Sequence, residues 1–139
     1  MKIILSDKNY YILRFDKDEE VISGLQKFMA DQSITAFAFN AIGACQSVEL
    51  GYFNPHLKDY RSKPYVEDFE IVSFSGNGAL ADGQPVVHAH GALARNDFSL
   101  IGGHIFKIVI SVTCEVFLTR LDGTATRVLN PDFNLKLLG

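Results

Sequence analysis

The stretch that most constrains the fold is residues 108–118, "IVISVTCEVFL", which is apolar at nearly every position. Its β-branched residues favour an extended strand. Successive side chains of a strand point to opposite faces of the sheet, so an apolar residue at almost every position implies that both faces are covered. This strand therefore requires two covering layers, one on each side of its sheet.

The rest of the chain reads mostly as further strands joined by tight turns. Gly43 predicts a bulge or bend within a long extended segment. Asp82-Gly83 and Asp122-Gly123 are turn signals. A polar, proline-marked stretch at 54–67 predicts a loop. The expected strands cover residues 10–15, 34–53, 69–80, 86–94, 99–106, 108–121, 124–129 and 133–138.

One segment has the periodicity of a helix, residues 16–32, "DKDEEVISGLQKFMADQ". Asp16 followed by Glu19 fits a capping box, and acidic residues in the first turn suit the positive end of the helix dipole. Apolar residues recur at helical spacing and predict one buried stripe. That stripe consists of Val21, Ile22, Leu25, Phe28 and Met29.

These elements predict an α+β fold, in which one main N-terminal helix packs against a strongly bent, mostly antiparallel sheet of about seven strands. A length of 139 residues predicts a single domain over residues 1–139. One helix covers only one face of such a sheet. We therefore expect the second face to be buried in a homo-oligomer.

Charge and composition indicate a cytoplasmic protein without a membrane partner. The formal net charge is −3 and the basic residues are scattered, which disfavours tight DNA binding by the domain alone. The start of the chain lacks the long apolar segment of a signal peptide, and no apolar run reaches membrane-spanning length. Cys45 and Cys114 form no CxxC motif and are expected to be reduced, buried thiols.

Three of the four histidines lie within residues 86–104, "VVHAHGALARNDFSLIGGH". His88 and His90 are two apart and so share one face of a strand. A hairpin turn centred on Asn96 would place His104 opposite His88, with Cβ atoms about 5 Å apart. Three imidazoles with one open position are typical of an exposed or catalytic zinc site. The alternative is a set of partly buried histidines that hydrogen-bond to the backbone or to one another.

Glu70 and Glu115 stand inside apolar strands, which makes them candidates for catalysis. A buried carboxylate is costly unless it is paired, and burial raises its pKa. Either residue could serve as a general base or as a ligand. The alternative for both is a structural carboxylate bonded to a neighbouring polar group.

The stretch 56–65, "HLKDYRSKPY", is the one place where basic and aromatic residues alternate. Lys58, Arg61 and Lys63 could contact phosphates, while Tyr60 and Tyr65 could stack on bases. A solvated loop is the alternative interpretation of this stretch.

Three segments together resemble the plants and prokaryotes conserved domain, or PPC domain. They are "AFNAIGACQSVELGYF", "FEIVSFSGNGALADGQPVVHAHGAL" and "IGGHIFKIVISVTCEVFL". The resemblance extends over about residues 8–138. It implies an α/β fold with a major antiparallel sheet and assembly into homotrimers.

The resemblance also carries two functional implications. Plant members follow AT-hook segments that hold the minor groove of DNA, and stand-alone prokaryotic members are often labelled DNA-binding by association. This chain has no basic Arg-Gly-Arg core of an AT-hook. Some prokaryotic members hold a metal, usually taken as zinc, on histidines that match His88, His90 and His104. The family implies no firm catalytic activity.

Three functional hypotheses follow. The first is a homotrimeric PPC-domain protein with a three-histidine site for zinc or a small ligand. The second is a metal-dependent hydrolase that uses this site with Glu115 or Glu70 as acid or base. The third is a DNA-binding or regulatory protein that acts through a partner or through residues 56–65.

Overall fold

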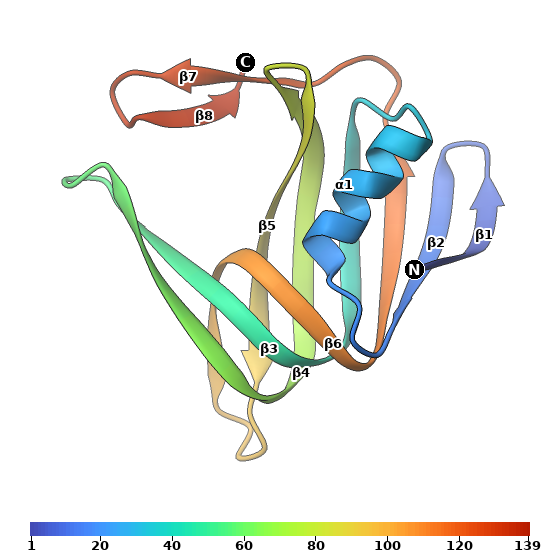
Figure 1. Cartoon of the computed structure of the whole chain (residues 1–139), viewed down its shortest axis with the longest axis vertical. Coiled ribbons are helices and arrows are strands. Elements are labelled where there is room, and N and C mark those ends of the chain that lie inside the picture. Colours follow the sequence, from blue (N-terminus) through green and yellow to red (C-terminus); the bar gives the residue numbers. More distant parts are fainter.

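A computed structural model describes residues 1–139 and contains one α-helix and eight strands (Figure 1). This confirms the predicted α+β class. The pattern predicted no strand at residues 2–7, where the structure has β1. The elements in chain order are β1 (Lys2–Asp7), β2 (Tyr10–Asp16), α1 (Val21–Asp31), β3 (Phe37–Asn54), β4 (Asp59–Ala81), β5 (Gln84–Ala94), β6 (Leu100–Arg120), β7 (Thr126–Asn130) and β8 (Leu135–Leu138).

The strands form one bent sheet in the order β1-β2-β6-β3-β4-β7-β8, and β5 pairs with both β4 and β6. All pairs are antiparallel except β4 with β7. Because β5 joins β4 to β6, and β3 also lies between those two, four strands pair in a closed ring. This ring is consistent with the strongly bent sheet that the sequence predicts.

Helix α1 packs against the inside of the bent sheet (Figure 1). Its buried residues are the predicted stripe, from Val21 to Met29. The predicted start is wrong: Glu20 caps the helix by accepting hydrogen bonds from two backbone N–H groups of its first turn. The expected Asp16–Glu19 contact forms through the N–H of Asp16, but it lies in the turn before the helix. No helix of the structure has the length and apolar character needed to cross a membrane.

Residues 54–67 are not the loop that their proline content suggests. After a short turn the chain continues as β4, and Pro64 pairs with Glu49 of β3 in a long protruding hairpin (Figure 1). Here β4 has a neighbour on one side only, because its pairing with β5 begins at Glu70. A proline lacks an N–H donor, and the free edge of a strand tolerates that loss.

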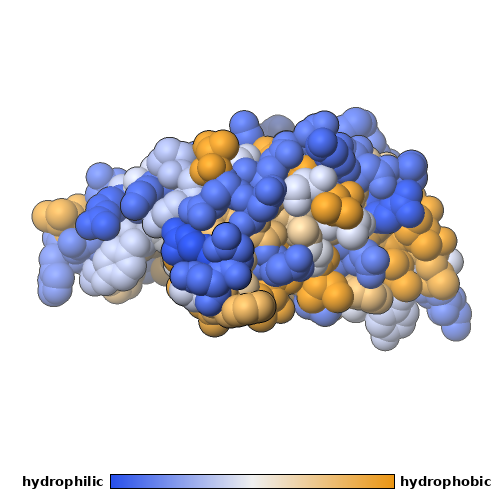
Figure 2. Space-filling model, turned by 90° about the horizontal axis from the view of Figure 1, so that it is seen from below, coloured by the Kyte–Doolittle hydropathy of each residue, from blue (hydrophilic) through white to orange (hydrophobic).

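Strand β6 is one continuous element of 21 residues rather than two strands. Its inward residues, including Ile108, Ile110 and Val116, are fully buried in the core. Cys45 and Cys114 are free and buried there as well, as predicted. The outward side of the sheet is not covered by this chain. Seen from below, apolar side chains reach the surface, notably along the lower edge (Figure 2).

Gly43 confirms the predicted bulge. The pairing of β3 shifts register on either side of it, against β4 and against β6. Its φ angle is 153°, and a Cβ atom added there would lie 2.1 Å from the carbonyl oxygen of Thr113. The backbones of β3 and β6 approach each other at this point in a way that only glycine permits.

Replacing Gly43 with alanine should therefore destabilise the fold. We expect Gly43→Ala to lower the free energy of unfolding by about 3 kcal/mol, from combined backbone strain and steric overlap. Gly123→Ala is the matched control, since Gly123 also has a positive φ of 102° but nothing lies within 4 Å of its added Cβ. That variant should lose only about 1 kcal/mol. Urea unfolding at one protein concentration measures both, and equal losses would contradict the argument.

Candidate metal centre

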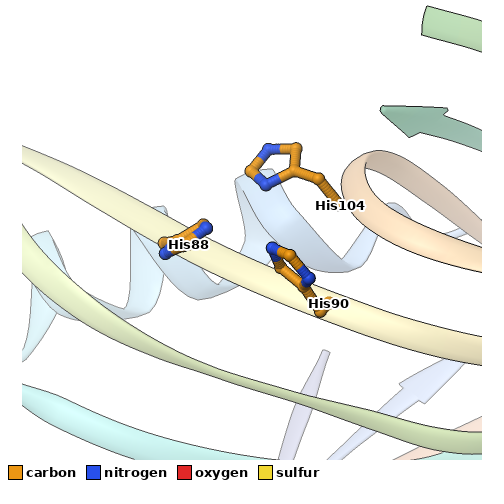
Figure 3. A group of neighbouring side chains, drawn as sticks. All are labelled: His88, His90 and His104. Carbon is orange, nitrogen blue, oxygen red and sulfur yellow. The ribbon is translucent and has the colours of Figure 1, made fainter. Parts of the chain in front are cut away.

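Strands β5 and β6 bring three histidines together (Figure 3). His88 and His90 project from β5, and His104 projects from β6 toward them. Their ring centroids are 5.1 to 5.5 Å apart, and one nitrogen from each ring lies within 4.8 Å of the others. The expected meeting of the three imidazoles is confirmed, while metal binding stays a prediction.

The register that produces this cluster differs from the predicted one. His104 lies opposite His90, not opposite His88, because the hairpin turn is centred one residue later than Asn96. In the turn, Arg95 N–H donates to the carbonyl of Ser99, and Phe98 has a φ of 65°. A turn centre displaced by one residue changes the pairing by two. Side chains alternate with a period of two, so His104 stays on the histidine face.

His104 occupies a crowded position between two strands. It pairs with His90 of β5 on one side and with Gly51 of β3 on the other. The preceding Gly103 has a φ of 155°, and a Cβ there would lie 2.7 Å from the carbonyl oxygen of Gly51. Gly103 thus allows β3 and β6 to approach closely next to the cluster.

Aromatic rings surround His104. Its ring centroid lies 4.5 Å from that of Phe106 and 5.1 Å from that of Tyr60. This burial, together with the neighbouring His88 and His90, lowers the pKa of His104 to about 4. Burial also lowers the pKa of His88, and the charges of Arg127 and His90 add to the effect. Both imidazoles are therefore neutral at pH 7, which is the form that binds metal.

The cluster fits a transition metal such as zinc. Three nitrogens that share one zinc ion at about 2.1 Å lie about 3.4 Å apart, which modest side-chain rotation from the present positions would reach. The Nδ1 atom of His104 is buried without a hydrogen-bond partner. A buried nitrogen left unpartnered is costly unless a ligand, an ion or a water satisfies it. The cluster contains no carboxylate.

A cavity of about 620 Å³ adjoins His88 and His104. One of its lining residues is Arg127 of β7, which donates a hydrogen bond of 2.8 Å to the side-chain oxygen of Asn77. Asn77 pairs with His88 in the sheet, so this bond fixes the guanidinium beside the cluster. Sequence reasoning missed Arg127 because the parallel β4–β7 pairing that positions it leaves no local signal.

Neither candidate carboxylate joins the histidines. Glu70 and Glu115 are both exposed, so the expectation of burial is wrong. In β4 and β6 the alternate positions next to them, such as Phe69 and Cys114, point into the core instead. Glu70 lines a different hollow, together with Arg95 and Phe98, and Glu115 is eleven positions along β6 from His104. The proposed roles as base or ligand at this cluster therefore have no geometric support.

The basic and aromatic stretch lies at the outer end of the β3–β4 hairpin, where Lys58, Arg61 and Lys63 are exposed. The amine of Lys63 lies 4.8 Å from the ring centre of Tyr65. Tyr60 is not free to stack on a base, since its ring packs against Phe53, Phe106 and His104.

Solved structures similar to this one share its whole fold. A protein from Bacteroides thetaiotaomicron, provisionally described as DNA-binding, is 27% identical with a TM-score of 0.93, over 97% of this chain and 94% of that chain. A plant- and prokaryote-conserved protein from Pyrococcus horikoshii is 29% identical with a TM-score of 0.90, over 100% and 97%. A metal-containing protein from Archaeoglobus fulgidus is 31% identical with a TM-score of 0.88, over 99% of each chain.

Family membership follows from the sequence match as well. No curated protein matches the chain. The family profile described as the Plants and Prokaryotes Conserved (PCC) domain matches residues 5–122, which is most of the sequence. The resemblance noted from the three sequence segments is thereby confirmed, and the chain belongs to the plants and prokaryotes conserved domain family.

Proposed function

We propose that this protein is a homotrimeric PPC-domain protein whose three histidines hold zinc and, beside it, a small ligand. The carrying observation is the cluster of His88, His90 and His104, with ring nitrogens within 4.8 Å of one another at the edge of a cavity. The similarity to the metal-containing protein of Archaeoglobus fulgidus supports a bound metal.

Zinc held by three histidines keeps a coordination position for water or for a ligand oxygen. Such an ion can polarise a carbonyl group or lower the pKa of a bound water. A metal-dependent hydrolase is therefore an alternative within the same site. Glu70 and Glu115 do not supply its acid or base at this cluster, so the small-ligand function is the one that the geometry favours.

The uncovered face of the sheet supports assembly into an oligomer. Ile42 of β3 and Phe117 of β6 are 52% and 42% exposed, while their neighbours Ala41 and Val116 are buried in the core. Alternation along a strand places Ile42 and Phe117 on the face opposite the core. Val72 and Val112 are also exposed, at 52% and 70%. Several large apolar side chains exposed on one face of a sheet are typical of a protein interface.

The metal prediction can be tested on protein purified without a histidine tag or chelator. We expect about one zinc ion per chain by elemental analysis, because three imidazoles meet at one point. The His88→Ala/His104→Ala variant should lose the metal. His56→Ala is the matched control and should keep it, since His56 lies outside the cluster. Wild-type protein that is empty and does not take up added zinc would overturn the metal proposal.

The trimer prediction can be tested by sedimentation equilibrium. We expect a mass of three chains of 15.4 kDa for the wild type. The Ile42→Lys/Val112→Lys variant should shift toward the monomer, because two charges would have to be buried in the interface. Both side chains are exposed in one chain, so the variant should still fold. Leu57→Lys, at the tip of the β3–β4 hairpin, is the control. A wild-type monomer at micromolar concentration would contradict the proposal.

A DNA-associated role is the alternative that the description of the Bacteroides thetaiotaomicron structure favours. In this chain it would use Lys58, Arg61 and Lys63 at the hairpin tip. Phosphate contacts weaken steeply as salt rises. Retention on duplex DNA that falls with salt, and that the triple alanine variant abolishes, would favour this role. With a net charge of −3, we expect no retention at physiological salt.

A further inference from the structure

The cavity beside the histidines holds one positive charge without a counter-ion. Its charged lining residues are Asp82, Lys136 and Arg127. Asp82 and Lys136 form an ion pair with each other. Arg127 takes part in none of the salt bridges of the chain. The guanidinium therefore lies in the cavity with its charge uncompensated.

The guanidinium of Arg127 does not have hydrogen-bond acceptors for all of its donors. The guanidinium has five N–H donors. It donates to the side-chain oxygen of Asn77 and, over 3.2 Å, to the backbone carbonyl of Lys136. Both acceptors are neutral, and the Nε atom is buried without any partner. Burial without a counter-ion lowers the pKa of Arg127. A half-buried guanidinium in this state is stabilised by an acceptor that carries negative charge.

The remaining lining of the cavity is largely apolar and lies between α1, the β5–β6 region and the β7–β8 hairpin. Nonpolar side chains line the cavity around the guanidinium and the histidines. A ligand that fits this lining combines one anionic group with an apolar body. The apolar side chains include Ile22, Val86, Phe106, Leu135 and Leu137.

We propose that this cavity binds a small monocarboxylic acid, with its carboxylate on the guanidinium of Arg127 and its apolar body against α1 and β8. The inference rests on the proposed function, because the acid would lie beside the histidine metal site. A carboxylate matches the planar fork of the arginine guanidinium. Inorganic phosphate has no apolar part to bury against Ile22, Leu135 and Leu137.

The probe for the test is ¹³C-carboxylate-labelled butyrate, titrated into zinc-supplemented wild-type protein and followed by NMR. We expect millimolar binding, and the Nε–H resonance of Arg127 should shift during the titration. Hexanoate should bind more tightly than butyrate, by up to about fourfold per added methylene. Phosphate should bind more weakly. No shift at tens of millimolar butyrate, or tighter binding of phosphate, would overturn the carboxylate assignment.

Three variants complete the experiment. Arg127→Gln should weaken butyrate binding at least tenfold, and Arg127→Lys should restore it only in part because lysine lacks the planar fork. Arg120→Gln removes a guanidinium that does not line the cavity and should bind butyrate like the wild type. Equal affinities in all three variants would overturn the proposal. If Arg127→Gln does not fold, the wild-type Nε–H shift still decides the question.

Zinc content, measured on the same samples, separates this proposal from the metal proposal. Arg127→Gln should keep its zinc, since Arg127 is outside the histidine cluster. Wild-type protein without zinc that binds butyrate through Arg127 would refute the metal site and leave the carboxylate site standing. Protein that holds zinc but shows no Arg127-dependent binding of butyrate would refute the carboxylate site alone.

Discussion

Strand β6 is the element on which the rest of the structure depends, because it hydrogen-bonds to three other strands. Its first residues pair with β5, its middle and end pair with β3, and its last third also pairs with β2. Strands β3, β4, β5 and β6 pair in a closed ring, and a flat sheet cannot close in this way, so β6 has to bend. The bend is possible because glycines and bulges occur where strands approach most closely, above all at Gly43 and Gly103. Without that bend, α1 would not face a concave sheet and the core would stay open.

The same bend creates the histidine site. His104 lies where β6 passes from the β5 pairing into the β3 pairing, so that it has a strand on either side. The rings of Tyr60 and Phe106 pack against it and partly bury it. A histidine placed there is uncharged at neutral pH, because burial penalises the charged form. The fold thereby supplies a neutral imidazole with a free nitrogen, and β5 presents two more imidazoles to it.

Local sequence signals predicted the elements well and their tertiary partners poorly. The buried stripe of α1 and the Gly43 bulge follow from periodicity and from the special backbone of glycine, both of which act over short distances. That the three histidines share one face also follows from local alternation. Because side chains alternate with a period of two, a pairing error of two residues did not change that face. In contrast, Glu70 and Glu115 were expected to be buried because their neighbours are apolar. Both are exposed on strands whose outward face this chain leaves uncovered.

Arg127 shows most clearly what local patterns omit. It belongs to a short strand near the end of the chain, and only the parallel pairing of β7 with β4 carries it to Asn77 and so to His88. A half-buried charge without a counter-ion lowers the stability of a fold, and so does a buried imidazole nitrogen without a partner. Here both residues line one cavity, and their buried atoms Arg127 Nε and His104 Nδ1 have no hydrogen-bond partner. Arg127 Nε is a donor without an acceptor, and His104 Nδ1 is a nitrogen that can bind a metal. A site for a metal and an anionic ligand would contain both kinds of atom.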